Sequence, residues 1–400
     1  MIPSRRLCVA WLFTCLAGIS PLAGKTFRIT ITAADVDRAG QVVQFPMPEN
    51  SAGFGVLLDK AQAAVPLQIG DGVARFVVPE QKAGEALVFV LTQAKAEPMP
   101  GVEVKTAGDG LQVSVAGAPA FAYRMDKEAL PRSDIRAEYK RAGYIHPVYS
   151  PSGKIVTDDY RPRREHHHGI WSPWTKTSFQ GRAPDFWNTH DKTGTVEFVA
   201  LDRTWSGPVH GGFVARHKMV DLSAPAPVAA LNETWEVTAY HLREARIFDI
   251  VVTQTCATTD PLILPEYHYG GMGLRGSSEW LGRDKPAILT SEGVSDRVKA
   301  HTNKVRWLHV GGTVGGTLTG IAMMGHPDNF RAPQPVRVAE GEPFFCFAPS
   351  QGGDWKIEPG KPYVARYRYV VADGSPDRAR LDAFWNGYAR PPVVKVEGAP

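Results

Sequence analysis

The chain has 400 residues, 43% of them hydrophobic and 22% charged, which is enough ordinary globular sequence for one large or two medium domains. The formal net charge of +4 is too small to indicate binding to nucleic acid or to an anionic membrane surface. No Lys/Arg-rich run suggests either partner.

The first 24 residues have the pattern of a signal peptide. Arg5 and Arg6 precede an apolar run from Leu7 to Ile19, and small residues follow near Ala23. The run is short for a membrane span, and no later segment is apolar enough to cross a bilayer. We therefore expect an exported, periplasmic or secreted protein with no membrane span in the mature chain. A retained anchor is the alternative.

After residue 24 the chain is dominated by short strand patterns. β-Branched and aromatic residues alternate in TFRITITA, ARFVVP, VEFVALD, ETWEVTAY, RIFDIVVTQT and YVARYRYVV, and Gly, Pro, Asn and Asp separate these runs. Helical periodicity is scarce, with the best candidate at 375–388, where Ser375 or Asp377 is suited to cap the helix. The pattern predicts an all-β fold built on a large twisted β-sandwich, with a small N-terminal β region at 25–120 and a main domain at 121–390.

Two cysteines, Cys256 and Cys346, remain after the predicted signal peptide. Each lies in a strand-like run, so in an oxidising compartment they would either pair or stay as separate buried thiols. No CxxC motif occurs, so the sequence does not predict a thiolate zinc site.

Polar, aromatic and glycine residues concentrate in three loop-like segments, 143–171, 265–280 and 325–337. Strands on either side would hold these loops on a rigid frame, where binding residues usually lie. The candidate sugar-binding side chains in them are Tyr144, His146, Arg161, Trp171, Tyr269, Arg275, His326, Asn329 and Arg337. Aromatic rings among these would form a platform, and the arginines and the asparagine would bind hydroxyls or a carboxylate. The alternative is that Arg275 pairs with Glu279 on the surface and that 325–337 is a proline-stabilised turn.

The run Glu165-His166-His167-His168 is the least ordinary part of the sequence. If it is extended, His166 and His168 face one side and His167 the other, so two imidazoles would converge on one side of the strand. With a third ligand such as His146, this pair would bind a divalent metal. Two alternatives are that one histidine is a general acid or base, and that the cluster only stabilises the fold.

The second segment places Glu266 and His268 on the same side of a strand. A carboxylate beside an imidazole adjusts the pKa of the imidazole for acid-base catalysis. We therefore include Glu266 and His268 with His166 and His167 as candidate catalytic residues.

Three motifs follow in a characteristic order: HPVYSPSGKIVTDDYRPRREHHHGIW, then EYHYGGMGLRG, then HPDNFRAPQPVR. This order resembles the family labelled "methane oxygenase PmoA", secreted bacterial proteins of essentially unknown function, over about residues 120 to 375. Many members have HHRGLW where this chain has HHHGIW, so His168 replaces an arginine. That difference argues against a shared metal role and favours His166 and His167 as the functional pair.

The resemblance implies an all-β protein with a carbohydrate-directed role. For the predicted β-sandwich we expect a fold that resembles the supersandwich of galactose-mutarotase-like enzymes. The leading hypothesis is an exported enzyme that cleaves a glycoside or a sugar derivative by hydrolysis or elimination. The second hypothesis is a metal-dependent oxidative or hydrolytic enzyme that uses His146, His166 and His168. The third is a non-catalytic glycan-binding protein.

Overall fold

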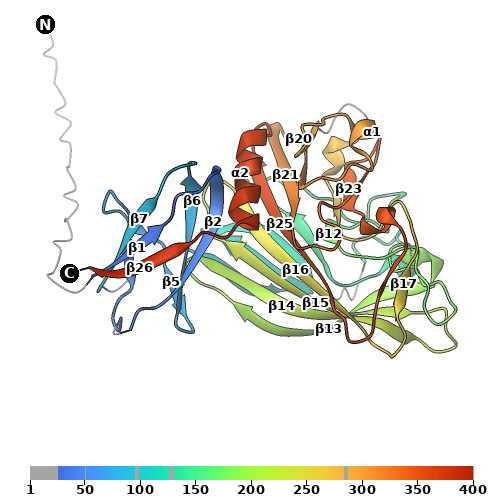
Figure 1. Ribbon diagram of the computed structural model, residues 1–400. Coiled ribbons are helices and arrows are strands. Elements are labelled where there is room, and N and C mark those ends of the chain that lie inside the picture. Colours follow the sequence, from blue (N-terminus) through green and yellow to red (C-terminus); the bar gives the residue numbers. More distant parts are fainter. Residues whose placement is uncertain (1–25, 50, 95–98, 126–129, 283–286, 400) are drawn as a thin grey trace, which may run out of the picture.

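The computed structural model describes residues 26–49, 51–94, 99–125, 130–282 and 287–399, so the predicted signal peptide lies outside the described residues. Strands dominate this part of the chain (Figure 1), which confirms the predicted all-β class. The helical elements are α1 (Arg297–Ala300), α2 (Arg378–Ala389), and four 3-10 turns, Ala137–Tyr139, Thr189–Asp191, Ser278–Trp280 and Pro349–Gly352.

Two eight-stranded antiparallel sheets form the main body. In spatial order, the first contains β22 (Val336–Val338), β23 (Phe344–Phe347), β18 (Gly273–Arg275), β12 (Ile170–Trp171), β11 (Tyr144–Val148), β10 (Ala118–Arg124), β9 (Gly110–Val115) and β8 (Val102–Ala107). The second contains β13 (Gly194–Trp205), β14 (His210–Asp221), β15 (Val228–Tyr240), β16 (Arg246–Cys256), β25 (Tyr363–Asp373), β21 (Thr317–Gly325), β20 (Trp307–Val314) and β19 (Ala287–Thr290). A two-stranded sheet, β17 (Leu262–Leu264) with β24 (Trp355–Ile357), lies beside them.

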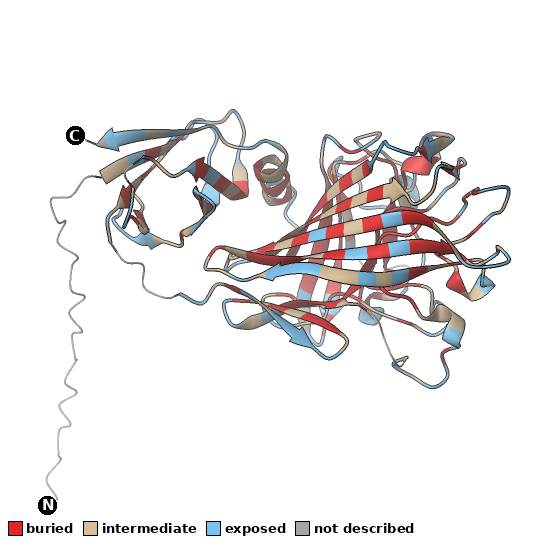
Figure 2. Cartoon of the chain, turned by 90° about the horizontal axis from the view of Figure 1, so that it is seen from below, coloured by how far each residue is buried: buried red, intermediate tan, exposed pale blue. Residues whose placement is uncertain are grey.

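The two large sheets pack face to face as the predicted β-sandwich. One continuous apolar core joins them, and Phe121 of β10 meets Phe248 of β16 at a centroid distance of 4.6 Å. Along the long strands of the second sheet, buried residues alternate with more exposed ones (Figure 2), as the two-residue repeat of a strand requires when one face is covered.

A smaller module at the N-terminal end has its own core. Its five-stranded sheet contains, in spatial order, β26 (Val394–Ala399), β1 (Thr26–Ile31), β7 (Leu87–Thr92), β3 (Val56–Leu58) and β4 (Ala64–Val65). Its three-stranded sheet contains β2 (Arg38–Pro46), β6 (Val73–Gln81) and β5 (Gln68–Gly70). The sequence places the end of this region at residue 120, but β8, β9 and β10 pair within the first large sheet. The C-terminal strand β26 returns to pair with β1. The boundary near residue 120 and the place of β26 both depend on strands that pair over long sequence distances. Local sequence patterns contain no information on such pairing.

Helix α2 joins the small module to the sandwich (Figure 1). Of the two predicted caps, Ser375 and Asp377, it is Asp377 that caps the first turn, by accepting from the backbone N–H groups of Ala379 and Arg380. Leu381 and Phe384 pack in one apolar cluster with Ala39 of the module. The two bodies are therefore held by packing through α2 as well as by strand β26.

The two cysteines are separate free thiols. Cys256 donates its S–H to the carbonyl of Ile357, and burial raises the pKa of the Cys346 thiol to about 12. The structure therefore supports the alternative of two isolated thiols and not the disulfide. No helix in the described ranges is long and apolar enough to cross a membrane.

Replacing Gly387 with alanine tests the contact between α2 and the module. Alanine favours a helix by about 1 kcal/mol over glycine, but a Cβ at Gly387 would lie 2.3 Å from the carbonyl oxygen of Ala39. We expect Gly387→Ala to lower the free energy of unfolding by about 2 kcal/mol because of this overpacking. Chemical denaturation measures the change. Gly70→Ala is the control, because a Cβ there meets nothing within 4 Å. Equal stability of the two variants would contradict the packing described for α2.

Candidate functional site

A cavity of about 170 Å³ collects side chains from all three predicted segments. We call it the histidine cavity, and its lining residues are Arg164, His166, His167, Trp187, His268, Tyr269, Arg337, Ala339, Glu342 and Phe344. Strands β12, β18, β23 and β22 are neighbours in the first large sheet, and the lining residues lie on them or in the loops that flank them. The sheet order therefore brings distant parts of the sequence to one place.

The loop before β12 is a pair of tight turns and not an extended strand. The N–H of Arg164 donates to the carbonyl of Arg161, and the N–H of His167 donates to the carbonyl of Arg164. Arg163 sits at φ 69°, in the left-handed region. The predicted alternation of the three histidines is therefore wrong, because the two-residue period holds only in an extended chain.

The three histidines occupy different environments. His166 is half-buried at the cavity, with its ring stacked near Tyr139 at a centroid distance of 6.5 Å. His167 is buried against Phe344 at 4.7 Å. His168 is fully buried, and its Nδ1 lies 2.7 Å from Oδ1 of Asp159.

The predicted metal set is not assembled. His146 lies outside the histidine cavity, and its Nδ1 is 2.9 Å from Oγ1 of Thr157. Within the described ranges, no group of three or more His, Cys, Asp or Glu side chains has the arrangement to hold a metal ion. The set His146, His166 and His168 fails because His146 on β11 bonds Thr157, His168 bonds Asp159 in the core, and His166 lies at the cavity.

The cavity histidines are neutral at pH 7. Burial, assisted by the neighbouring His190 and His168, lowers the pKa of His166 to about 3. Burial also lowers the pKa of His167 well below its ordinary value, and the charges of His166 and Arg275 act in the same direction. For His268 the pKa is lowered by burial and then by the Arg337 charge.

Nδ1 of His167 accepts a hydrogen bond from Arg275. Nη1 of Arg275 lies 3.5 Å from Nδ1 of His167, and a guanidinium can only donate, so Nδ1 accepts. In the neutral ring the proton then resides on Nε2. His167 is thus a neutral hydrogen-bond donor.

Glu342 is the carboxylate of the cavity, and sequence reasoning did not single it out. Its Oε2 lies 2.8 Å from Nη1 of Arg161 and 2.5 Å from Nη2 of Arg275. Arg275 is fully buried, so Glu342 supplies its counter-charge, and the predicted surface pair with Glu279 is wrong. The available signal was a lone acidic residue in EPFFCF, directly before an apolar strand.

Trp187 and Tyr269 form an aromatic wall of the cavity, with centroids 5.0 Å apart and a T-shaped contact. Asp185 holds the Trp187 loop by accepting the N–H groups of Trp187 and Asn188. Nδ2 of Asn188 in turn lies 3.3 Å from the hydroxyl of Tyr269. The sequence alone does not distinguish Trp187 from a core tryptophan, because Trp is a routine residue of sandwich cores.

Glu266 does not join the site. The chain leaves β17 at Leu264 and continues as bends, so Glu266 and His268 do not share a strand face. Glu266 is exposed, and its backbone N–H donates to Oδ1 of Asp354. No hydrogen bond or ion pair joins Glu266 to His268, both of which the structure describes, so the predicted catalytic pair is wrong.

Two predicted platform residues belong to the core. Tyr144 is fully buried and donates its hydroxyl to Oδ2 of Asp159, at 3.0 Å. Trp171 is also fully buried and packs on Trp187. Of the three predicted platform rings, Tyr269 alone lines the cavity.

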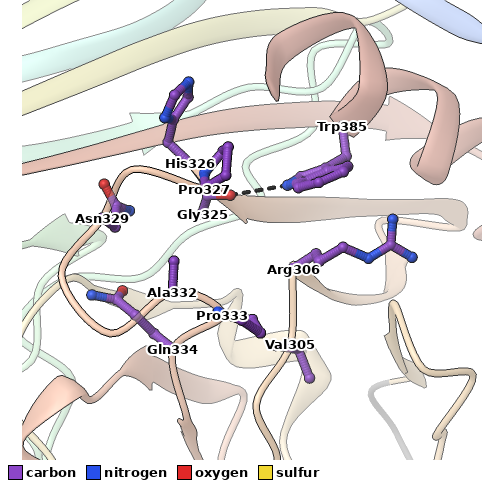
Figure 3. A pocket seen from close by; sticks show the side chains of 10 residues that line it. All are labelled: Val305, Arg306, Gly325, His326, Pro327, Asn329, Ala332, Pro333, Gln334 and Trp385. Carbon is purple, nitrogen blue, oxygen red and sulfur yellow. Dashed lines mark hydrogen bonds between the residues drawn. The ribbon is translucent and has the colours of Figure 1, made fainter. Parts of the chain in front are cut away.

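The third predicted segment divides between two cavities. Arg337, on β22, lines the histidine cavity. His326 and Asn329 instead line a separate cavity of about 200 Å³ beside Trp385 of α2 (Figure 3). The amide of Asn329 is bonded at both ends to the backbone of Arg366, so it fixes its loop to β25.

A family model described as "Family of unknown function (DUF6807)" matches residues 110–386. The chain belongs to this family. All residues of the histidine cavity fall within the matched segment. No curated protein matches the chain. The resemblance to the "methane oxygenase PmoA" group stays a prediction.

Two solved structures from Enterococcus faecalis are similar to the chain. One is an alpha-mannosidase from strain V583, at 11% identity and a TM-score of 0.41, covering 94% of this chain and 46% of that chain. The other is a protein in the glycosyl hydrolase family 38, at 9% identity and a TM-score of 0.38, covering 94% and 47%. The chain spans less than half the length of either protein.

Removing the Glu342 charge should destabilise the fold. Glu342→Gln leaves the buried Arg275 guanidinium without its counter-charge, so we expect the free energy of unfolding to fall by about 3 kcal/mol, at the lower end for a broken buried ion pair. Chemical denaturation measures it. Glu197→Gln, an exposed change on β13, is the control and should shift stability by less than about 0.5 kcal/mol. A similar small shift in Glu342→Gln would show that the pair contributes little.

Because burial lowers the pKa of His166, the free energy of unfolding should decrease as the pH falls. The unfolded chain takes up a proton near pH 6.5, whereas the folded chain does so at about pH 3. Between these values the unfolded state binds more protons, so stability falls as the pH decreases, by up to about 1.4 kcal/mol per pH unit for one histidine. We expect His166→Asn to make this fall less steep between pH 6.5 and 4, while His167, His210 and His309 still contribute to it, as measured by denaturation at a series of pH values. An unchanged slope would contradict a neutral, buried His166.

Proposed function

We propose that the protein is an exported carbohydrate-active enzyme and that the histidine cavity is its active site. The observation that carries the proposal is the convergence of three neutral imidazoles, a tyrosine, arginines and one carboxylate from three distant segments. Clusters of titratable groups with displaced pKa values, gathered in one cavity, are typical of catalytic sites. The signal-peptide pattern of residues 1–24 supports export.

The wall of the cavity supports a sugar as the ligand. Tyr269 provides the more exposed aromatic surface, with the buried rings of Trp187 and Phe344 beside it, and His167 provides a fixed hydrogen-bond donor. A sugar ring has apolar faces that pack on aromatic rings and hydroxyls that need polar partners. Such a mixture of aromatic and directional polar groups suits a carbohydrate better than a purely apolar ligand.

The charges favour elimination over hydrolysis. Hydrolysis of a glycoside in most families uses two carboxyl groups on opposite sides of the bond. Among the described residues that line the histidine cavity, Glu342 is the one carboxylate, and Arg161 and Arg275 already bind it. A paired-carboxylate mechanism is therefore not supported by this geometry.

The histidines divide the work of an elimination. His268 is exposed at the cavity and neutral at pH 7, so it is placed to accept a proton from a carbon beside a carbonyl or carboxyl group. The Nε2–H of His167 donates to the oxygen on which negative charge develops, in a buried setting where such a bond is strong. The bond from the next carbon to the glycosidic oxygen breaks, that oxygen takes the proton that His268 has accepted, and a double bond remains in the product.

Mass spectrometry of products from neutral, oxidised and acidic oligosaccharides tests this function. We expect an unsaturated product that has not gained the mass of water. His268→Asn and His167→Asn should each lower turnover by about 10²- to 10⁴-fold, the usual contribution of a positioned acid-base group.

His241→Asn is the matched control, because His241 lies outside the cavity and bonds the carbonyl of Pro208. A product that gains water would instead indicate hydrolysis. Saturable binding without any product would support a glycan-binding protein, and loss of activity with a chelator would support the metal-dependent alternative.

A further inference from the structure

The two arginines that line the histidine cavity have no acidic partner among the residues that the structure describes. Nη1 of Arg164 donates to the carbonyl of Arg163, and Nη1 of Arg337 donates to the carbonyl of Val338. Neither guanidinium forms an ion pair with any carboxylate in the described ranges. They differ in this from Arg161 and Arg275, which share Glu342.

No free carboxylate in the described lining of the cavity balances the positive charges of Arg164 and Arg337. Glu342 is engaged by two guanidinium groups, and the imidazoles are neutral at pH 7. Glu165, on the same loop, directs its Oε1 to the backbone N–H of Arg163 and does not line the cavity. Arg164 and Arg337 therefore supply two net positive charges facing one small space.

We propose that the substrate carries a carboxylate, as a uronic acid residue does, and that Arg164 and Arg337 bind this carboxylate. The inference rests on the proposed function and names its substrate class. The planar guanidinium matches the two oxygens of a carboxylate and is the preferred partner for it in proteins. One arginine comes from the loop before β12 and the other from β22, so the fold brings two cations together that are 173 positions apart in sequence.

A bound carboxylate also makes the elimination chemically consistent. Arg164 and Arg337 neutralise the carboxylate, which makes the hydrogen on the adjacent carbon easier to remove. His268 takes that proton, and the electron pair forms the double bond to the next carbon. The glycosidic C–O bond breaks, and the departing oxygen takes the proton that His268 has accepted. The products together have the mass of the substrate, and no oxidant or reductant is needed.

Calorimetric titration of the full chain with defined probes tests the inference. The probes are galacturonate, glucuronate and mannuronate oligomers, their methyl esters, and sulfated neutral oligomers of the same length. We expect one of the acidic oligomers to bind and its methyl ester to bind at least about 10-fold more weakly. Arg164→Gln and Arg337→Gln should each weaken acid binding by about 10- to 100-fold, the effect of losing a charged hydrogen bond. Arg337→Lys should recover part of the loss, because it keeps the charge without the planar fork.

Arg163→Gln is the matched control, since Arg163 is the exposed neighbour of Arg164 and lies outside the cavity lining. Its binding should equal that of the unchanged protein. Equal binding of acid and ester, binding of sulfated oligomers alone, or no binding of any acidic oligomer would overturn the inference. Cleavage of neutral oligomers without preference for acids would overturn it and leave the proposed function standing. Binding of an acid without an unsaturated product would leave the carboxylate site standing and overturn the proposed function.

Discussion

The buried guanidinium of Arg275 is the constraint on which the site depends. A charge that is fully removed from water requires a partner, and Glu342 supplies it across the sheet. The backbone of the same residue accepts from the N–H of Asp158 and donates to the carbonyl of Gly169, so it also holds both ends of the histidine loop. One residue of β18 thereby sets the position of the loop before β12 and of the carboxylate before β23.

Burial gives three consecutive histidines three different chemical roles. His166 lies at the cavity and is kept neutral, His167 is held as a neutral donor by Arg275, and His168 is a core residue bonded to Asp159. An imidazole in such surroundings acts by hydrogen bonding and by accepting protons, not as a standing cation. The positive charge of the cavity therefore belongs to the arginines, whose ionisation does not vary near neutral pH.

The sandwich explains why the site is where it is. The strands that carry it are short and adjacent in space, in the order β22, β23, β18 and β12, although their residues span 170 to 347 in sequence. The long strands of the second sheet cover the other side of the core and contribute packing. The N-terminal module is joined through α2 and β26, and no described residue of it lines the histidine cavity.

Local patterns in the sequence predict the all-β class, the sandwich, a capped helix at 375–388, which the structure has at Arg378–Ala389, and the three regions from which site residues come. These features follow from local periodicity, capping and composition, which a single sequence contains. Of the named site residues, His166, His167, His268, Tyr269 and Arg337 do line the cavity.

The folded arrangement was needed to show that the cavity excludes Glu266, Asn329, Tyr144 and Trp171 and includes Glu342, Arg164 and Trp187. Strands that pair over long sequence distances determine where the side chains of the histidine turn point. The same pairing buries the rings of Tyr144 and Trp171 and places Glu342 beside the buried Arg275. No local pattern in a sequence reports such pairing.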